Sequence, residues 1–284
     1  MTDVQKVILS IFENVTRICS THNIPYYAIG GTCIGAVRHH GFIPWDDDLD
    51  IAIPIEFYDD FIKIAKKELP FEYEVLTPDS YQHYNALWAK VCDKRTTFIE
   101  NNEYSYRDSY KGVFVDVMPI SGIPDSKIGS FLFCKRLQYL DRFNHILRFS
   151  PLAPRSKRYS KYLPFIILSK ILPFKFFSNI FIRLLQQYPF YKSSQTGYVW
   201  YTCWLDRLKF PTTWFGEGFE MPFETSPIKC PKKFHEYLTF QFGDYMTLPP
   251  ENKRQVHMGF VDLNTPYTEY QKKGLDLMQK HLNN

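Results

Sequence analysis

The sequence predicts a globular fold of the α/β or α+β class. Helical and strand-like patterns alternate through the first third of the chain, and this alternation is shared by the two classes. Apolar residues make up 45% of the 284 residues and charged residues 23%, as in an ordinary globular domain. These values exclude a disordered chain, a collagen-like chain and a long coiled coil. We find no internal repeat and no low-complexity tract, and we expect a single domain.

Three helices are expected early in the chain. Apolar residues recur at helical spacing from Val4 to Ile18, and Thr2 with Gln5 matches a capping box. Gly41 is a typical stop signal after the second helix. The expected helices run from Val4 to just before Asn23, from Thr32 to His40, and from Ile55 to Leu69.

Short apolar runs between these helices predict strands. The pair Gly30-Gly31 ends the first run, and Pro44-Trp45 leads into the second. The expected strands lie at residues 26–29, 46–53, 75–76, 87–91 and 113–117. Residues 127–190 predict helical pieces separated by prolines, and residues 201–260 predict a turn-rich segment.

The charge is concentrated in one stretch, although the whole chain carries a net charge of only +4. Residues 127–183 hold twelve Lys and Arg but a single acid, Asp141. A membrane span needs about 20 mostly apolar residues, and the apolar runs here are interrupted by Pro164, Lys170, Pro173, Lys175 and Arg183. Two interpretations remain open for this stretch. It is either a helical insert with a solvated basic face or an interfacial segment that lies on anionic lipid.

The cysteine pattern indicates a reducing compartment. No two of the six cysteines are closer than 14 residues, so zinc-ligand spacing is absent. The sequence starts Met1-Thr2-Asp3-Val4-Gln5, without a charged and then apolar leader. We therefore expect a cytoplasmic protein.

An acidic run, Asp46-Asp47-Asp48-Leu49-Asp50, carries the most specific chemical signal. In a strand, Asp46, Asp48 and Asp50 point to the same face. Two such carboxylates about 4 Å apart repel by roughly 4 kcal/mol at an effective dielectric of about 20. No basic residue in the run offsets this repulsion, whereas a divalent cation would. An EF-hand is rejected, because Ile51 and Phe57 occupy the places where that loop needs Gly and Glu.

A further acid, Asp116, lies in the strand-like run Val113 to Met118. A buried carboxylate without a partner is unfavourable, so Asp116 is expected to meet one. If its strand lies beside the first acidic strand, then Asp48, Asp50 and Asp116 converge on one ion.

The glycine pair supplies the features of a phosphate site. Glycines let backbone N–H groups approach an anion, and the helix that follows places its positive N-terminus there. We expect Gly30, Gly31 and Thr32 to bind a phosphate group. Arg38 and Lys90 are candidate clamps for the same group. Because Mg²⁺ is usually held by a few carboxylates together with substrate phosphates, the two halves form one coherent site.

These residues resemble the nucleotidyltransferase superfamily, with its Gly-Gly turn, paired-acid strand and third acid. The string from Gly35 to Ile51, Gly-Ala-Val-Arg-His-His-Gly-Phe-Ile-Pro-Trp-Asp-Asp-Asp-Leu-Asp-Ile, is similar to the LicD family, which includes bacterial phosphocholine transferases and fukutin-related proteins. Further similar strings lie at residues 89–93, 115–119 and 242–250. The gap from Gly31 to Asp48 is somewhat longer than is usual in the superfamily.

The resemblance implies an α+β nucleotidyltransferase-like core, a small mixed sheet flanked by helices. This core would comprise residues 1–125 and 201–284, with a basic, mainly helical insert at 126–200. It implies an enzyme that moves phosphocholine or a similar group from a CDP-alcohol donor to a hydroxyl of a cell-surface glycan or lipid-linked saccharide, releasing CMP. The glycan would be teichoic acid, capsule or lipopolysaccharide. Asp48, Asp50 and Asp116 would be catalytic and would bind Mg²⁺, or Mn²⁺ in its place.

Additional site candidates are Asp46 and His257, of which His257 would contact phosphate. Two other functions remain open from the sequence: a nucleotidyltransferase that releases pyrophosphate from an NTP, and a non-catalytic membrane- or glycan-binding module. Nucleic acid is not expected as a partner, because the acidic site would repel its phosphates. The expected location is the cytoplasm, with peripheral contact to the inner face of the cell membrane through residues 127–183.

Overall fold

The computed structural model describes residues 1–80, 84, 86–101, 110–148, 174–198, 209–254 and 256–273.

The first helix, α1 (Asp3–Thr21), contacts the acidic run through a residue of its first turn. The predicted capping box is present, since the Gln5 N–H donates to Thr2 Oγ1 and Gln5 Oε1 accepts the Thr2 N–H. The Gln5 amide then donates to the carbonyl oxygens of Ile43 and Asp46, at 3.2 and 2.8 Å. One local motif thus caps the helix and anchors the loop that carries the aspartates.

The other elements of the first half follow the order that the sequence predicts. The two further helices are α2 (Gly30–His39) and α3 (Ile55–Glu68). The strands are β1 (Tyr27–Ala28), β2 (Asp50–Pro54), β3 (Tyr73–Leu76), β4 (Ala89–Glu100) and β5 (Lys111–Ile123). β4 and β5 are longer than expected. Every residue of β5 is buried, so it lacks the polar alternation that marks a strand in a sequence.

One expectation for the acidic run is wrong. The extended segment was expected to start at Asp46, but β2 starts at Asp50. Residues 44–45 form a turn, because the Asp46 N–H donates to the carbonyl oxygen of Ile43 at 2.9 Å. Asp46, Asp47 and Asp48 therefore lie in a loop that leads into the strand.

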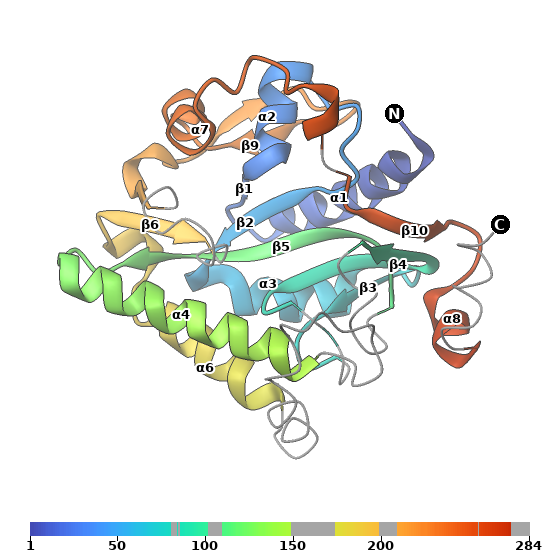
Figure 1. Cartoon of the computed structure of the whole chain (residues 1–284), viewed down its shortest axis with the longest axis horizontal. Helices are drawn as coiled ribbons and strands as arrows, with labels where there is room; N and C mark the ends of the chain where they lie inside the picture. The colour runs from blue at the N-terminus through green and yellow to red at the C-terminus, as the bar shows by residue number, and fades with distance from the viewer. Residues whose placement is uncertain are drawn as a thin grey trace.

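The main sheet is mixed (Figure 1). Its order is β1-β2-β5-β4-β10, with β3 also paired to β4, and with β6 pairing to both β5 and β7. β2 and β5 run parallel, whereas the remaining described pairs are antiparallel. These later strands are β6 (Gln195–Tyr198), β7 (Phe210–Pro211) and β10 (Met258–Asp262). The α+β class with a mixed sheet is thus confirmed.

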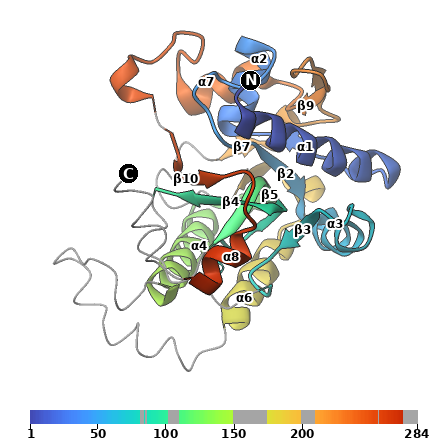
Figure 2. The same cartoon turned by 90° about the vertical axis from the view of Figure 1, so that its right-hand side faces the viewer.

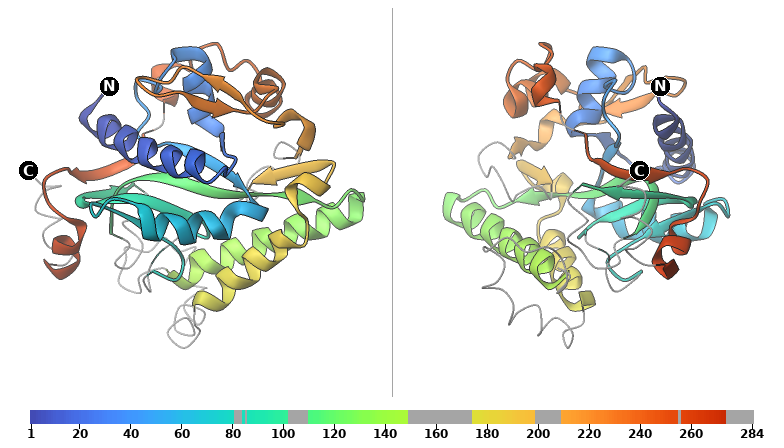
Figure 3. Two further views of the ribbon diagram at one scale, coloured as in Figure 1. Left: turned by 180° about the vertical axis from the view of Figure 1, so that it is seen from behind. Right: turned by 45° about the vertical axis from the view of Figure 1, so that its right-hand side comes forward.

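Helices cover the sheet in groups. α1 and α3 contact each other and β5, and they lie along the same part of the sheet in Figure 2. On the upper side in Figure 1 lie α2, α7 (Phe234–Phe242) and the hairpin of β8 (Phe219–Met221) and β9 (Ile228–Cys230). Figures 1 and 3 both place α4 (Lys127–Arg148) and α6 (Phe174–Gln186) side by side on the lower side. α8 (Tyr267–Lys273) contacts the end of β4.

The basic segment is integrated with the core. Its described helices α4 and α6 contribute Phe133, Leu137, Phe181 and Leu185 to the main hydrophobic cluster. β6, which lies within the predicted insert, pairs with the last four residues of β5, Ile120 to Ile123, so the main sheet extends into residues 126–200. Residues 149–173 lie outside the described part. Among the described helices, none combines the length and the apolar character needed to cross a membrane.

Candidate active site

Three charged residues form a row across neighbouring strands. Asp50 at the start of β2 stands opposite Asp116 on the parallel strand β5. Asp116 in turn stands opposite Lys90 on the antiparallel strand β4. Residues in register on adjacent strands point to the same face, so the pairing brings these three side chains together. The two strands that carry these acids are therefore adjacent, and Asp50 stands beside Asp116.

Lys90 and Asp116 form a buried ion pair. Lys90 Nζ lies 2.7 Å from Asp116 Oδ1 and 2.8 Å from Oδ2, and the two side chains are only 4% and 8% exposed. The indole N–H of Trp88 donates to Asp116 Oδ1 at 2.5 Å. Burial raises the pKa of Asp116, while the Lys90 ammonium opposes this rise. Lys90 also lies 3.6 Å from the ring centre of Phe114.

The structure gives Lys90 an acidic partner. The strand register places its ammonium on the carboxylate of Asp116, and the side chain is only 4% exposed. Lys90 is thus a residue that holds Asp116 in place and neutralises its charge.

The other aspartates repel one another around Asp50. Burial, and then the charges of Asp48 and Asp116, raise the pKa of Asp50 well above its usual value. Burial, followed by the charge of Asp48, raises the pKa of Asp46 to about 8. The repulsion that the sequence predicted is therefore present at Asp46, Asp48 and Asp50, even though only Asp50 belongs to the strand. A cation would relieve it by binding the ionised carboxylates.

On the other side of the loop, His257 is paired with acidic groups. Its Nδ1 lies 3.1 Å from Asp48 Oδ2 and 3.4 Å from Asp47 Oδ1. Asp47 is buried and accepts the backbone N–H groups of His257 and Met258. Asp47, followed by Asp48, raises the pKa of His257 to about 11. These two carboxylates favour the protonated form of the imidazole, and Asp47 joins the acidic loop to the start of β10.

The N-terminus of α2 faces two of the aspartates. Gly30 has φ +57°, a conformation that side-chain-bearing residues rarely adopt, and its N–H donates to the hydroxyl of Tyr237 at 3.0 Å. A Cβ at Gly31 would lie 3.0 Å from Asp46 Oδ2, and one at Gly30 would lie 3.8 Å from Asp50 Oδ2. Thr32 is buried, and its Oγ1 accepts the Asp50 N–H at 2.8 Å. The hydroxyl of Thr32 thus fixes the first residue of β2.

Arg38 is not brought together with these residues. It lies in the last turn of α2, eight residues beyond Gly30, which corresponds to about 12 Å of helix. Its guanidinium donates to the carbonyl oxygen of Tyr245 and to His39. The structure therefore gives Arg38 a contact that joins α2 to the segment after α7, and not the expected place at the glycine turn.

Two groups of side chains could hold a metal ion, and they share no residue. One consists of the carboxylates of Asp48, Asp50 and Asp116, whose charges act on one another. The other consists of Asp46, Asp47 and His257, whose ligand atoms all lie within 4.8 Å of one another. In the second group the carboxylate of Asp47 already accepts two backbone N–H groups, and His257 would bind a metal in its neutral form. The first group offers only carboxylate oxygens, which are ligands that hard divalent cations accept.

Comparison with known proteins identifies the family of this site. The family described as LicD/FKTN/FKRP, nucleotidyltransferase domain, matches residues 23–153, which include all three residues of the charged row. The chain is 30% identical over 260 residues to the lipopolysaccharide cholinephosphotransferase LicD of Haemophilus influenzae, covering 89% of this chain and 94% of that protein. The chain belongs to the LicD family. It is thus an enzyme, a LicD-type phosphotransferase.

Two further relatives of the LicD-family chain match over shorter regions. An uncharacterized protein of Rickettsia prowazekii is 30% identical over 128 residues, which is 43% of this chain and 47% of that protein. One of Rickettsia typhi is 44% identical over 52 residues, or 17% of each chain.

Three site residues of this LicD-family protein were missed or underrated from sequence. Trp88 lies two residues before Lys90, a spacing that places both side chains on one face of an extended segment. Tyr237 reads as a core residue, and only its contact with Gly30 reveals a role at the glycine turn. Asp47 looks like one more acid in a run, although its burial separates it from its neighbours.

Proposed function

We propose that this LicD-type enzyme transfers phosphocholine, or a closely similar phospho-substituent, from a CDP-alcohol to a hydroxyl of a cell-surface glycan and releases CMP. The observation that carries the proposal is the cluster of Asp48, Asp50 and Asp116 beside the N-terminus of α2. Such a cluster holds a cation next to a place where a diphosphate can sit. The name of the Haemophilus relative supports a choline-phosphate group and a lipopolysaccharide acceptor.

In this proposal Asp48 and Asp50 hold the metal ion, Mg²⁺ or Mn²⁺. When bound, the ion would neutralise the donor diphosphate and so favour departure of CMP. Lys90 and Trp88 hold the Asp116 carboxylate in one orientation. A carboxylate has about four lone-pair positions, so Asp116 keeps a position with which to share the ion or to accept the proton of the attacking hydroxyl.

The glycine turn would receive the donor phosphates. The first N–H groups of a helix have no acceptor within the helix, and Gly31 has no side chain to block access to its backbone. Because Tyr237 accepts the Gly30 N–H, the turn is held in one geometry before the donor arrives. The bound anion would then lie between these amides and the aspartates.

The decisive experiment measures CMP release from CDP-choline, CDP-ethanolamine, CDP-glycerol and CDP-ribitol, with and without Mg²⁺ and with a cell-envelope extract as acceptor source. We expect Mg²⁺-dependent CMP release from one donor, and loss of this release in Asp48→Asn. Phe71→Ser is a matched control, since this exposed ring lies outside the site. Equal activity of Asp48→Asn and the wild type would overturn the metal assignment.

The same assay distinguishes a nucleotidyltransferase reaction. If the enzyme uses an NTP, pyrophosphate appears in place of CMP, and CDP-alcohols give no product. That result would keep the acidic site in the proposal and replace the CDP-alcohol donor by an NTP.

We also propose that the reaction takes place at the cytoplasmic face of the cell membrane. The described cysteines Cys19, Cys33, Cys92, Cys134 and Cys230 are free and buried, as in proteins of reducing compartments. Labelling of intact and lysed cells with a membrane-impermeant lysine reagent tests this location. Labelling of the protein in intact cells would contradict it.

A further inference from the structure

The outward face of α4 exposes an unusual group of apolar side chains. Ile128, Phe131, Leu132 and Tyr139 are 76%, 53%, 48% and 65% exposed. They follow one another at spacings of three, one and seven residues, so they lie along one side of the helix. Exposed apolar residues gathered in this way mark an interaction surface.

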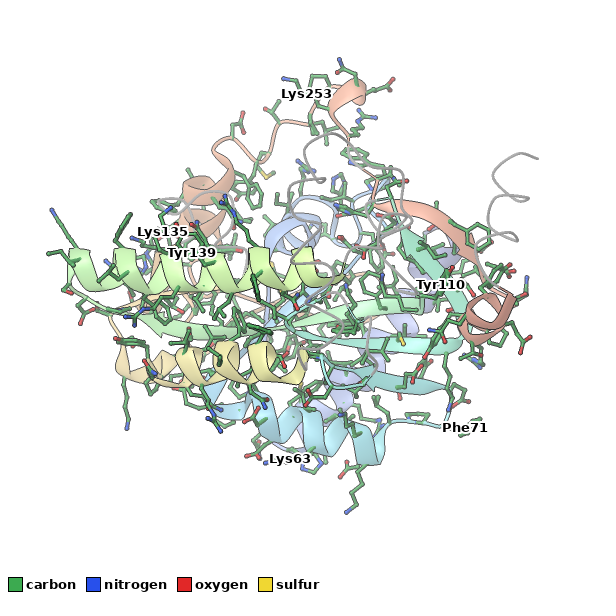
Figure 4. All side chains as sticks on the ribbon, turned by 60° about the horizontal axis from the view of Figure 1, so that its bottom comes forward. Lys63, Phe71, Tyr110, Lys135, Tyr139 and Lys253 are labelled. Carbon is green, nitrogen blue, oxygen red and sulfur yellow. The ribbon has the colours of Figure 1, made fainter. Side chains whose placement is uncertain are left out.

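The charged residues of α4 also differ in exposure according to their sign. Lys127, Arg136 and Arg142 are exposed, and Lys135 lies 5.7 Å from the ring centre of Phe131. The sole acid of α4, Asp141, is buried. In Figure 4, Lys135 and Tyr139 lie at the edge of α4 away from α6. The outward face is thus apolar and cationic, without an exposed carboxylate from α4 itself.

The inward face holds α4 in place. Phe133, Cys134 and Leu137 are buried in the main core, and the ring centres of Phe133 and Tyr188 are 5.0 Å apart. The outward side chains are therefore presented by a fixed helix. In the sequence, residues 149–173 after α4 add five Lys and Arg and no acid, which continues the charge bias.

We propose that the outward face of α4, formed by Ile128, Phe131, Leu132 and Tyr139 with Lys135 and Arg142, docks on an anionic phospholipid surface. Aromatic and aliphatic side chains enter the boundary between headgroups and acyl chains, while Lys and Arg meet the headgroup phosphates. A second copy of the chain is a poorer occupant, because two cationic faces repel each other. The docking requires no step of the proposed reaction and is measured without substrate.

The test is co-sedimentation of the full-length protein with vesicles of phosphatidylglycerol and phosphatidylcholine in equal parts, and with vesicles of phosphatidylcholine alone. We expect binding to the anionic vesicles that weakens with added salt. Two variants probe the face: Phe131→Ser/Leu132→Ser removes apolar insertion, and Lys135→Glu/Arg142→Glu reverses its charge. Each should lower the affinity at least about tenfold.

Matched controls lie on other surfaces. Phe71→Ser removes a ring that is 86% exposed, and Lys63→Glu reverses an exposed cation on α3; both residues are labelled in Figure 4. These controls should bind vesicles as the wild type does. Wild-type levels of binding by both face variants, with their thermal unfolding unchanged, would overturn the proposal. So would a wild-type dimer in sedimentation velocity that the face variants convert to a monomer, because the occupant would then be a second copy.

Discussion

Lys90 and Asp116 are joined in a buried ion pair, and the same aspartate stands opposite Asp50 on the next strand. This relationship couples the stability of the sheet to the charge of the site. Lys90 neutralises Asp116, one of the clustered carboxylates, and the His257 imidazole contacts another, Asp48. It also explains why a lysine lies fully inside a strand: its charge has a partner within the sheet.

Removal of Lys90 alone should strongly destabilise the fold. In Lys90→Met the Asp116 carboxylate loses its counter-ion in a buried place, and breaking such a pair costs about 3–5 kcal/mol. In the double variant Lys90→Met/Asp116→Asn both charges are gone, and most of that stability should return. Urea unfolding of the two variants checks this. Activity should be absent from both, since neither retains the ionised Asp116. If Lys90→Met has the same free energy of unfolding as the wild type, the ion pair contributes nothing to the stability of the fold.

Two of the glycines of α2, Gly31 and Gly35, should respond differently to alanine. A Cβ at Gly31 would lie 3.0 Å from Asp46 Oδ2, which is a flexible side-chain atom, whereas one at Gly35 would lie 2.5 Å from the backbone oxygen of Gly41. Gly31→Ala should therefore fold normally but lose about ten- to hundredfold in kcat/KM, because the carboxylate is displaced.

Gly35→Ala should instead lower the free energy of unfolding by about 1–3 kcal/mol, because two backbone segments must separate. Thermal unfolding and steady-state kinetics distinguish the two effects. If Gly31→Ala and Gly35→Ala lose the same free energy of unfolding, the proposed effect of Gly31 on activity alone is contradicted.

Local signals in the sequence predicted much of the fold. Thr2 and Gln5 interact within one helical turn, so their capping box and the start of α1 could be recognised directly. The convergence of Asp50 and Asp116 could be expected because each acid lies in its own apolar run. The partner of Lys90 could not be predicted, since it depends on the register of β4 against β5, and no local pattern encodes that register. The contact of His257 with Asp48 could not be predicted either, because it joins positions more than 200 residues apart that no local pattern links.

The stability of the metal-free protein should fall as the pH rises from about 4 toward 8. The pKa of Asp46 is raised from 3.8 to about 8 in the folded protein, so between these values the folded state binds more protons than the unfolded state. The raised pKa of Asp50 acts in the same direction. Deprotonation therefore costs folding free energy across this window. Asp46→Asn should flatten the pH profile of urea unfolding, and an unchanged profile would remove Asp46 as its source.

Mg²⁺ should stabilise the protein more at alkaline than at acidic pH. Metal binding requires ionised carboxylates, and protons compete for Asp50, whose pKa is raised well above its usual value. At saturating Mg²⁺ the gain should reach about 1–3 kcal/mol, seen as a shift of the thermal unfolding midpoint. Asp48→Asn should abolish the shift at every pH. A shift that is larger at acidic pH would contradict the carboxylate site.

The variant His257→Leu decides which group of side chains holds the ion. If the ion binds Asp48 and Asp50, loss of the imidazole removes a competing partner 3.1 Å from Asp48. The Mg²⁺-dependent shift of the unfolding midpoint should then persist or increase. If the ion binds Asp46, Asp47 and His257, the shift should disappear, because leucine has no atom that can bind a metal. Arg254→Gln serves as the control: this cation contacts the ring of Trp45 near the same loop but belongs to neither group. The contact of His257 with Asp48 leads us to expect persistence. A lost shift in His257→Leu, with a normal one in Arg254→Gln, would move the metal to the second group.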